Sequence, residues 1–138
     1  GEHEKALEIT ERALKADSTS LLFRFAKSTA LLNLGRYDEC IRLCRQLIKE
    51  KESFADAYYN IGLAYFNQAI ELNKDRQKYR SNKDKIIALY QRSKPYMEKY
   101  RTLVPEAKSK WLAPLYTIYL NLNMGKEFDE IDKIRKEK

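Results

Sequence analysis

Glycine, proline, histidine and cysteine are all scarce in this sequence of 138 residues. Four glycines and three prolines are too few to supply the turns of a many-stranded β sandwich or barrel. The single histidine, His3, and the two cysteines, Cys40 and Cys44, provide too few ligands for a zinc site. They also leave no histidine-activated nucleophile with an orienting group. No apolar run approaches the ~18 residues of a membrane-spanning helix.

Apolar residues and positive charge are abundant instead. Apolar side chains make up 43% of the chain and aromatic ones 12%, which is too much for an intrinsically disordered protein. The net charge is +7, and the whole surplus lies at residues 74–110, which contain 12 basic and four acidic residues. A local excess of this kind attracts anionic partners, although a solvated helix face is the alternative interpretation.

The sequence repeats itself with a period of 34 residues. Shifting the chain by that length places Leu7 on Ile41 and Ala30 on Ala64. From Cys40 onwards a match resumes at an offset of 53 residues. The difference predicts an insertion of about 19 residues between the two helices of one repeat.

Apolar residues recur three and four positions apart along most of the chain, which is the period of an amphipathic helix. The pattern predicts an all-α protein with seven helices and no strand. We expect these helices at residues 2–16, 20–34, 36–51, 54–73, 84–104, 106–123 and 126–137.

Two motifs match a known repeat. Residues 58–65, with the pattern Tyr-x-x-Ile-Gly-x-x-Tyr, resemble the W-x2-L-G-x2-Y signature of the tetratricopeptide repeat (TPR). Residues 93–97, Ser-x-x-x-Met, followed by Pro105, resemble its A-x3-F…P tail. The chain is therefore similar to the C-terminal repeats of a bacterial TPR protein.

This resemblance implies an all-α, TPR-like helix–turn–helix solenoid of about seven antiparallel helices over residues 1–138. Its parts would be a half repeat (1–18), a complete repeat (21–54), a repeat carrying an inserted extended hairpin at about 69–87 (55–105), and a terminal repeat (106–138). The chain opens within a repeat, so the sequence leaves the cellular location open.

Proteins of this kind commonly bind peptides or other proteins, so the resemblance implies a non-enzymatic scaffold without catalytic residues, metal or cofactor. The first helices of the repeats would line a concave face with an aromatic trough. The alternative is that the same residues form ordinary core. The candidate peptide-binding residues are Phe25, Tyr59, Asn60, Leu63, Phe66, Leu112, Tyr116 and Tyr119.

The inserted hairpin predicts a second contact surface. Apolar residues flank it on both sides, and its tip is predicted to be a mobile basic loop around Ser81 and Asn82. An acidic protein or peptide is the expected partner. The candidate anion-contacting residues are Lys74, Arg76, Lys78, Arg80, Lys83 and Lys85.

Two other functions stay open. One is anion or nucleic-acid binding through residues 74–110, where tyrosines alternate with basic residues, although the sequence makes nucleic acid the weaker choice. The other is a purely structural segment that self-associates, for instance as a homodimer through the open N-terminal end. Cys40 and Cys44 share a helix face, and we expect both to be reduced and buried.

Overall fold

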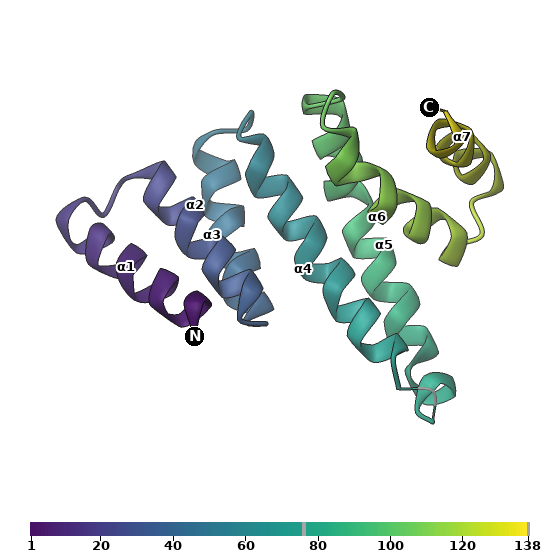
Figure 1. Ribbon diagram of the computed structural model, residues 1–138, viewed down its shortest axis with the longest axis horizontal. Helices are drawn as coiled ribbons and strands as arrows, with labels where there is room; N and C mark the ends of the chain where they lie inside the picture. Colours follow the sequence, from purple (N-terminus) through teal and green to yellow (C-terminus); the bar gives the residue numbers. More distant parts are fainter. Residues whose placement is uncertain (76, 138) are drawn as a thin grey trace.

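The computed structural model describes residues 1–75 and 77–137, and these residues form seven α-helices and no strand (Figure 1). The all-α prediction is confirmed. Six of the helices lie within a few residues of their predicted bounds, and the fifth begins earlier than predicted. The helices are α1 (Glu2–Ala16), α2 (Leu21–Asn33), α3 (Tyr37–Glu50), α4 (Ala55–Asn73), α5 (Tyr79–Leu103), α6 (Lys108–Asn121) and α7 (Gly125–Lys136).

Local chemistry explains where several helices begin and end. The Ser20 hydroxyl accepts the Phe23 N–H at 3.1 Å and caps the N-terminus of α2. Gly35 adopts a φ of +76° between α2 and α3, a conformation that glycine takes without a steric cost. Asn123 serves the same purpose after α6, with a φ of 55°.

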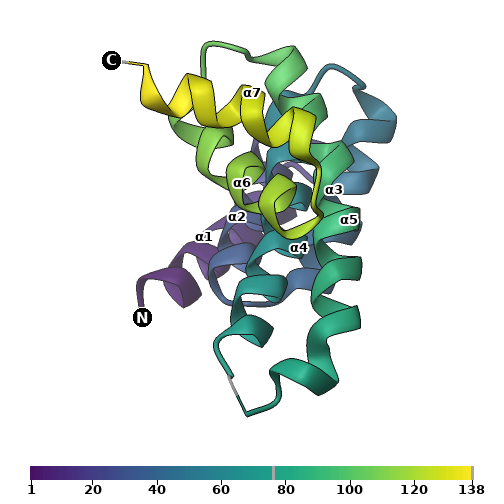
Figure 2. The same ribbon diagram turned by 90° about the vertical axis from the view of Figure 1, so that its right-hand side faces the viewer.

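Each helix packs mainly on its neighbours in sequence, and α2 also packs on α4. The buried residues form two clusters, one across α1–α4 and one across α4–α7. In Figures 1 and 2, α4 and α5 run side by side and extend together well beyond the other helices. No helix in the described part of the chain is both long enough and apolar enough to cross a membrane.

Small residues let α2 and α3 approach closely. Ser28 on α2 is fully buried, as are Cys40 and Cys44 on α3. Both thiols are free, as the sequence predicts. Hydrogen bonding to Cys44, together with burial, raises the pKa of Cys40 above its ordinary value.

A matching contact joins α4 and α5. The Ser93 hydroxyl donates to the Gly62 carbonyl oxygen at 2.7 Å. A Cβ atom on Gly62 would lie 3.0 Å from Met97 Cε. Gly62 aligns with Ser28 in the 34-residue shift, so the same helix position carries a small residue in both helix pairs.

The tip of the α4–α5 hairpin differs from its prediction. Ser81 and Asn82 lie in the first turns of α5 rather than in a mobile loop. The Asp75 side chain accepts the N–H groups of Gln77 and Lys78 at 3.1 and 3.2 Å, which closes a tight turn ahead of the helix. Because few residues are needed for the reversal, the helix can begin at Tyr79.

Candidate functional site

The residues of the predicted aromatic trough are covered by side chains of neighbouring helices. The Tyr59 ring lies 4.8 Å from that of Tyr100, and the Phe66 ring lies 5.9 Å from that of Tyr90, both centroid to centroid. The Lys110 ammonium also lies over the Tyr59 ring, at 5.6 Å. These half-buried rings therefore pack against α5 and α6 more than they form an open surface.

The other residues of the predicted trough also pack against neighbouring side chains. Phe25 packs on Phe54 with 5.5 Å between ring centroids, and Tyr116 packs on Phe128 with 5.0 Å. Leu63 and Leu112 are half-buried against the core. These contacts favour the alternative that the sequence left open, in which the residues belong to the core.

Burial removes two residues from the candidate peptide-binding face. Asn60 is 3% exposed, and its amide donates to Ser28 Oγ and Thr29 Oγ1, both at 3.0 Å, which joins α4 to α2. Tyr119 is also 3% exposed, and its hydroxyl donates to Glu98 Oε2 at 2.6 Å. Burial and this hydrogen bond raise the pKa of Tyr119. Both side chains hold helices together, and neither is available to a ligand.

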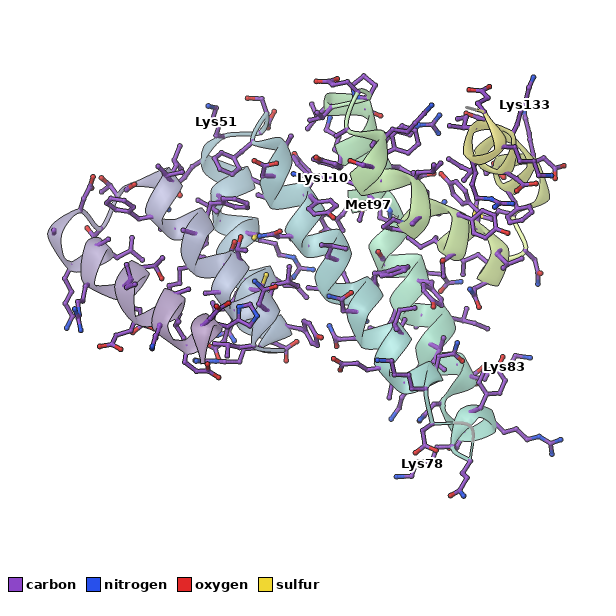
Figure 3. All side chains as sticks on the ribbon, in the orientation of Figure 1. Lys51, Lys78, Lys83, Met97, Lys110 and Lys133 are labelled. Carbon is purple, nitrogen blue, oxygen red and sulfur yellow. The ribbon has the colours of Figure 1, made fainter. Side chains whose placement is uncertain are left out.

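The basic hairpin, in contrast, is exposed where the sequence places it. Figure 3 shows Lys78 and Lys83 at the far end of the α4–α5 projection. Arg76 lies outside the described residues. Within the described part of the chain, the other five predicted contact residues are exposed and form no ion pair; they are Lys74, Lys78, Arg80, Lys83 and Lys85.

The tyrosines of this basic stretch do not form a stacking surface. Tyr79 is 42% exposed, but Tyr90 and Tyr100 are buried. Tyr96 is half-buried, with its ring 6.2 Å from that of Tyr65. Single-stranded nucleic acids stack their bases on exposed aromatic rings, so this arrangement does not favour the nucleic-acid alternative.

Sequence reasoning missed a groove between α3, α4 and α5. It consists of two adjoining hollows of about 360 and 320 Å3, which share Gln68, Leu89 and Arg92. We call it the arginine groove. The first hollow is also lined by Asp38, Ile41, Arg42, Arg45 and Tyr65, and the second by Leu72, Lys85 and Ala88.

One arginine of this groove is held in place by tyrosine. Arg45 Nη2 donates to the Tyr65 hydroxyl oxygen at 2.8 Å. Hydrogen bonding to Tyr96 and Tyr65 raises the pKa of the Arg45 guanidinium. The guanidinium is therefore fixed beside the first hollow, and no carboxylate of the described residues forms an ion pair with it.

The groove has only a weak signal in the sequence. Arg42 and Arg45 are one helical turn apart on α3 and look like part of an ordinary solvated face. Arg92, which lines the same hollow, lies far along the chain on α5 and reaches the hollow only through the packing of that helix. No periodicity connects these three positions.

On α4, the groove and the trough occupy opposite faces. Helical spacing of 100° per residue places Tyr65, Gln68 and Leu72 together, facing away from the stripe that carries Tyr59 and Phe66. The molecule thus offers the basic groove on one side of α4 and the packed aromatic residues on the other.

Among the described residues, no group of three or more His, Cys, Asp and Glu side chains is arranged to hold a metal ion. No protein-family model matches the chain, and comparisons with curated proteins and with solved structures found no similar protein.

Proposed function

We propose that this chain is a non-enzymatic interaction module of the helical-repeat type, similar to TPR proteins, that binds an acidic partner protein. The observation that carries the proposal is the projecting α4–α5 hairpin, whose described cations are exposed and form no ion pair with the described part of the chain.

Electrostatics explains why this shape suits recognition. Unpaired cations at the end of a projection lie closest to an approaching partner and raise the association rate with an acidic surface. Elsewhere in the basic stretch, Lys94 and Arg101 are already paired with Glu98 and Glu130. Five cations on the hairpin, in contrast, have no ion pair among the described residues: Lys74, Lys78, Arg80, Lys83 and Lys85.

The repeat interpretation is supported by the recurring helix contact. Ser28 contacts α3, and Gly62 contacts α5, and these two small residues occupy equivalent positions of the 34-residue shift. A stack of similar helix pairs presents extended surfaces to partners. Binding at such a surface requires no catalytic group.

Charge reversal at the hairpin tests the proposal. The triple variant Lys78→Glu, Arg80→Glu and Lys83→Glu removes three cations that make no ion pair in the described structure. We expect partner affinity to fall about tenfold or more and to lose its salt dependence. Partners are captured on the immobilised chain from a nuclease-treated extract of the source cells, identified, purified and measured by calorimetry.

A matched control reverses three exposed lysines away from the hairpin: Lys5→Glu, Lys51→Glu and Lys133→Glu. It makes the same change in net charge, so it should retain the partner. The proposal fails if both triple variants lose the partner equally, or if the proteins lost only by the hairpin variant are basic. Capture that occurs from an untreated extract but is lost after nuclease treatment would instead support nucleic-acid binding.

A further inference from the structure

We infer that the arginine groove binds an acidic peptide segment in which an aliphatic residue lies next to carboxylates. The inference rests on the proposed function, because it takes the ligand to be part of a partner protein. It names a different contact, however, since the groove is built from α3, α4 and α5 near the base of the hairpin.

Unpaired arginines are the first argument. Five described arginines form salt bridges within the chain, namely Arg12, Arg24, Arg36, Arg101 and Arg135. Arg42, Arg45 and Arg92 line one hollow, and none of them has a carboxylate within 4.0 Å among the described residues. Three like charges around one hollow repel one another, and an anion placed between them relieves that repulsion.

The chemistry of the lining favours carboxylates. A guanidinium offers two parallel N–H donors that match the two oxygens of a carboxylate. Tyr65 accepts a hydrogen bond from Arg45, so its own O–H remains free to donate to the same anion. Tyr65 is only 7% exposed, so little side-chain freedom is lost on binding.

The adjoining hollow supplies the apolar half of the site. It is lined by Leu72, Ala88 and Leu89, with Lys85 at its edge. Leu72 and Leu89 are half-buried and can cover one aliphatic side chain of the ligand. Gln68 lies between the two halves, and its amide N–H already donates to the Ala64 carbonyl at 3.1 Å. Its carbonyl oxygen is left to accept a peptide N–H.

Asp38 allows a test in which a substitution is expected to strengthen peptide binding. It is the carboxylate that lines the first hollow, and it opposes an incoming anion. Replacing it with asparagine should therefore tighten binding, whereas replacing an arginine should weaken it. The affinity of a nonspecific binding surface would not rise with the first substitution and fall with the second.

The probe is a terminally blocked nonapeptide of three Leu-Glu-Glu units, titrated into the 15N-labelled full chain at low salt. We expect shifts in the Nε–Hε signals of Arg42, Arg45 and Arg92 and in the backbone amides near Leu89. The same peptide with glutamine in place of glutamate, and one with serine in place of leucine, should each bind at least fivefold more weakly.

Two substitutions and one control complete the experiment. Arg92→Gln should weaken the nonapeptide at least fivefold, and Asp38→Asn should tighten it about twofold. Lys133→Gln, at an exposed position of α7, should leave the affinity unchanged. All three side chains are exposed, and circular dichroism verifies that the variants fold.

The inference is overturned if the glutamine peptide binds as well as the glutamate peptide, if the shifts are confined to residues 78–85, or if Arg92→Gln has no effect. It is also overturned if a thymidine oligonucleotide shifts the groove signals more than the peptide does. Hairpin-dependent capture of an acidic protein would survive any of these outcomes, so the proposed function and the groove are judged separately.

Discussion

At the scale of single residues, equivalent positions of the α2–α3 and α4–α5 pairs combine small and large side chains differently. Ser28 faces the Cys40–Cys44 stripe, whereas Gly62 faces the larger Met97. The missing Cβ of Gly62 makes room for the methionine. Interiors are packed to crystal-like density, so the two positions have to change together.

This exchange predicts a compensated pair of substitutions. Gly62→Ser forces a side chain to within 3.0 Å of Met97 Cε and should lower the free energy of unfolding by about 1–3 kcal/mol. Met97→Cys leaves a cavity and should lower it by about 2–4 kcal/mol. The double variant reproduces the α2–α3 combination and should cost less than the sum, as measured by urea unfolding. Strict additivity would contradict this account of the interface.

Tyr37 offers a test in pH. Its hydroxyl donates to Glu71 Oε1 at 2.6 Å, and burial together with that bond raises the pKa of Tyr37 to about 12. A raised pKa means that the folded state holds the proton longer, so stability is present below the ordinary pKa of 10 and is lost as the pH rises towards 12. The advantage of the natural protein over Tyr37→Phe should therefore shrink between pH 10 and 12. Unfolding at pH 8 and 11 measures it, and a constant difference would contradict the assignment.

At the scale of elements, the α4–α5 hairpin combines a stable base with an electrostatically unfavourable tip. Ala69 and Ile86 are buried at the base. Lys78 occupies the N-cap of α5 without a side-chain capping bond, although a cation at a helix N-terminus opposes the helix dipole. A lysine in this position is easier to explain by recognition than by stability.

Lys78→Asp separates these two roles. An aspartate can accept an N–H of the first turn and interacts favourably with the dipole, so stability should rise by about 0.5–1 kcal/mol. The same change removes a hairpin cation and should weaken the acidic partner. Thermal unfolding and amide hydrogen exchange over residues 80–85 measure the first effect, and partner calorimetry the second. If stability does not increase, Lys78 is not the cap of α5.

At the scale of the whole molecule, the exposed large hydrophobic residues are spread over four helices. Ile9 on α1, Leu22 on α2, Tyr79 on α5 and Leu120 on α6 are each more than 40% exposed. Singly exposed apolar residues are normal on monomers, whereas stable homodimers need a contiguous apolar patch. Among the described residues, Ile9 and Leu22 are the exposed large hydrophobic residues of the N-terminal end.

We therefore expect a monomer of 16.4 kDa. Light scattering at micromolar to hundred-micromolar concentration measures the mass. A dimer that dissociates on Ile9→Lys would overturn this prediction and support self-association through the N-terminal end. Leu120→Lys, on α6, serves as the matched control because it makes the same change far along the chain.

The sequence by itself determined the elements. Helical periodicity is a local property of neighbouring residues, so the seven helices of the described residues could be predicted, and so could the buried cysteines. The start of α5 was missed because Asp75 closes its turn in fewer residues than the polar composition indicated. Here a local hydrogen bond overrode a compositional argument.

Only the tertiary structure decided which surfaces are available. The half-exposed stripe of Tyr59 and Phe66 is covered because α5 brings its own rings against it. Arg45 and Arg92 line the same hollow for a related reason: the packing of α3 and α5 on α4 brings residues from distant parts of the chain together. A single helix carries no information about what its neighbour will place opposite it, and this is why the groove is absent from the sequence pattern.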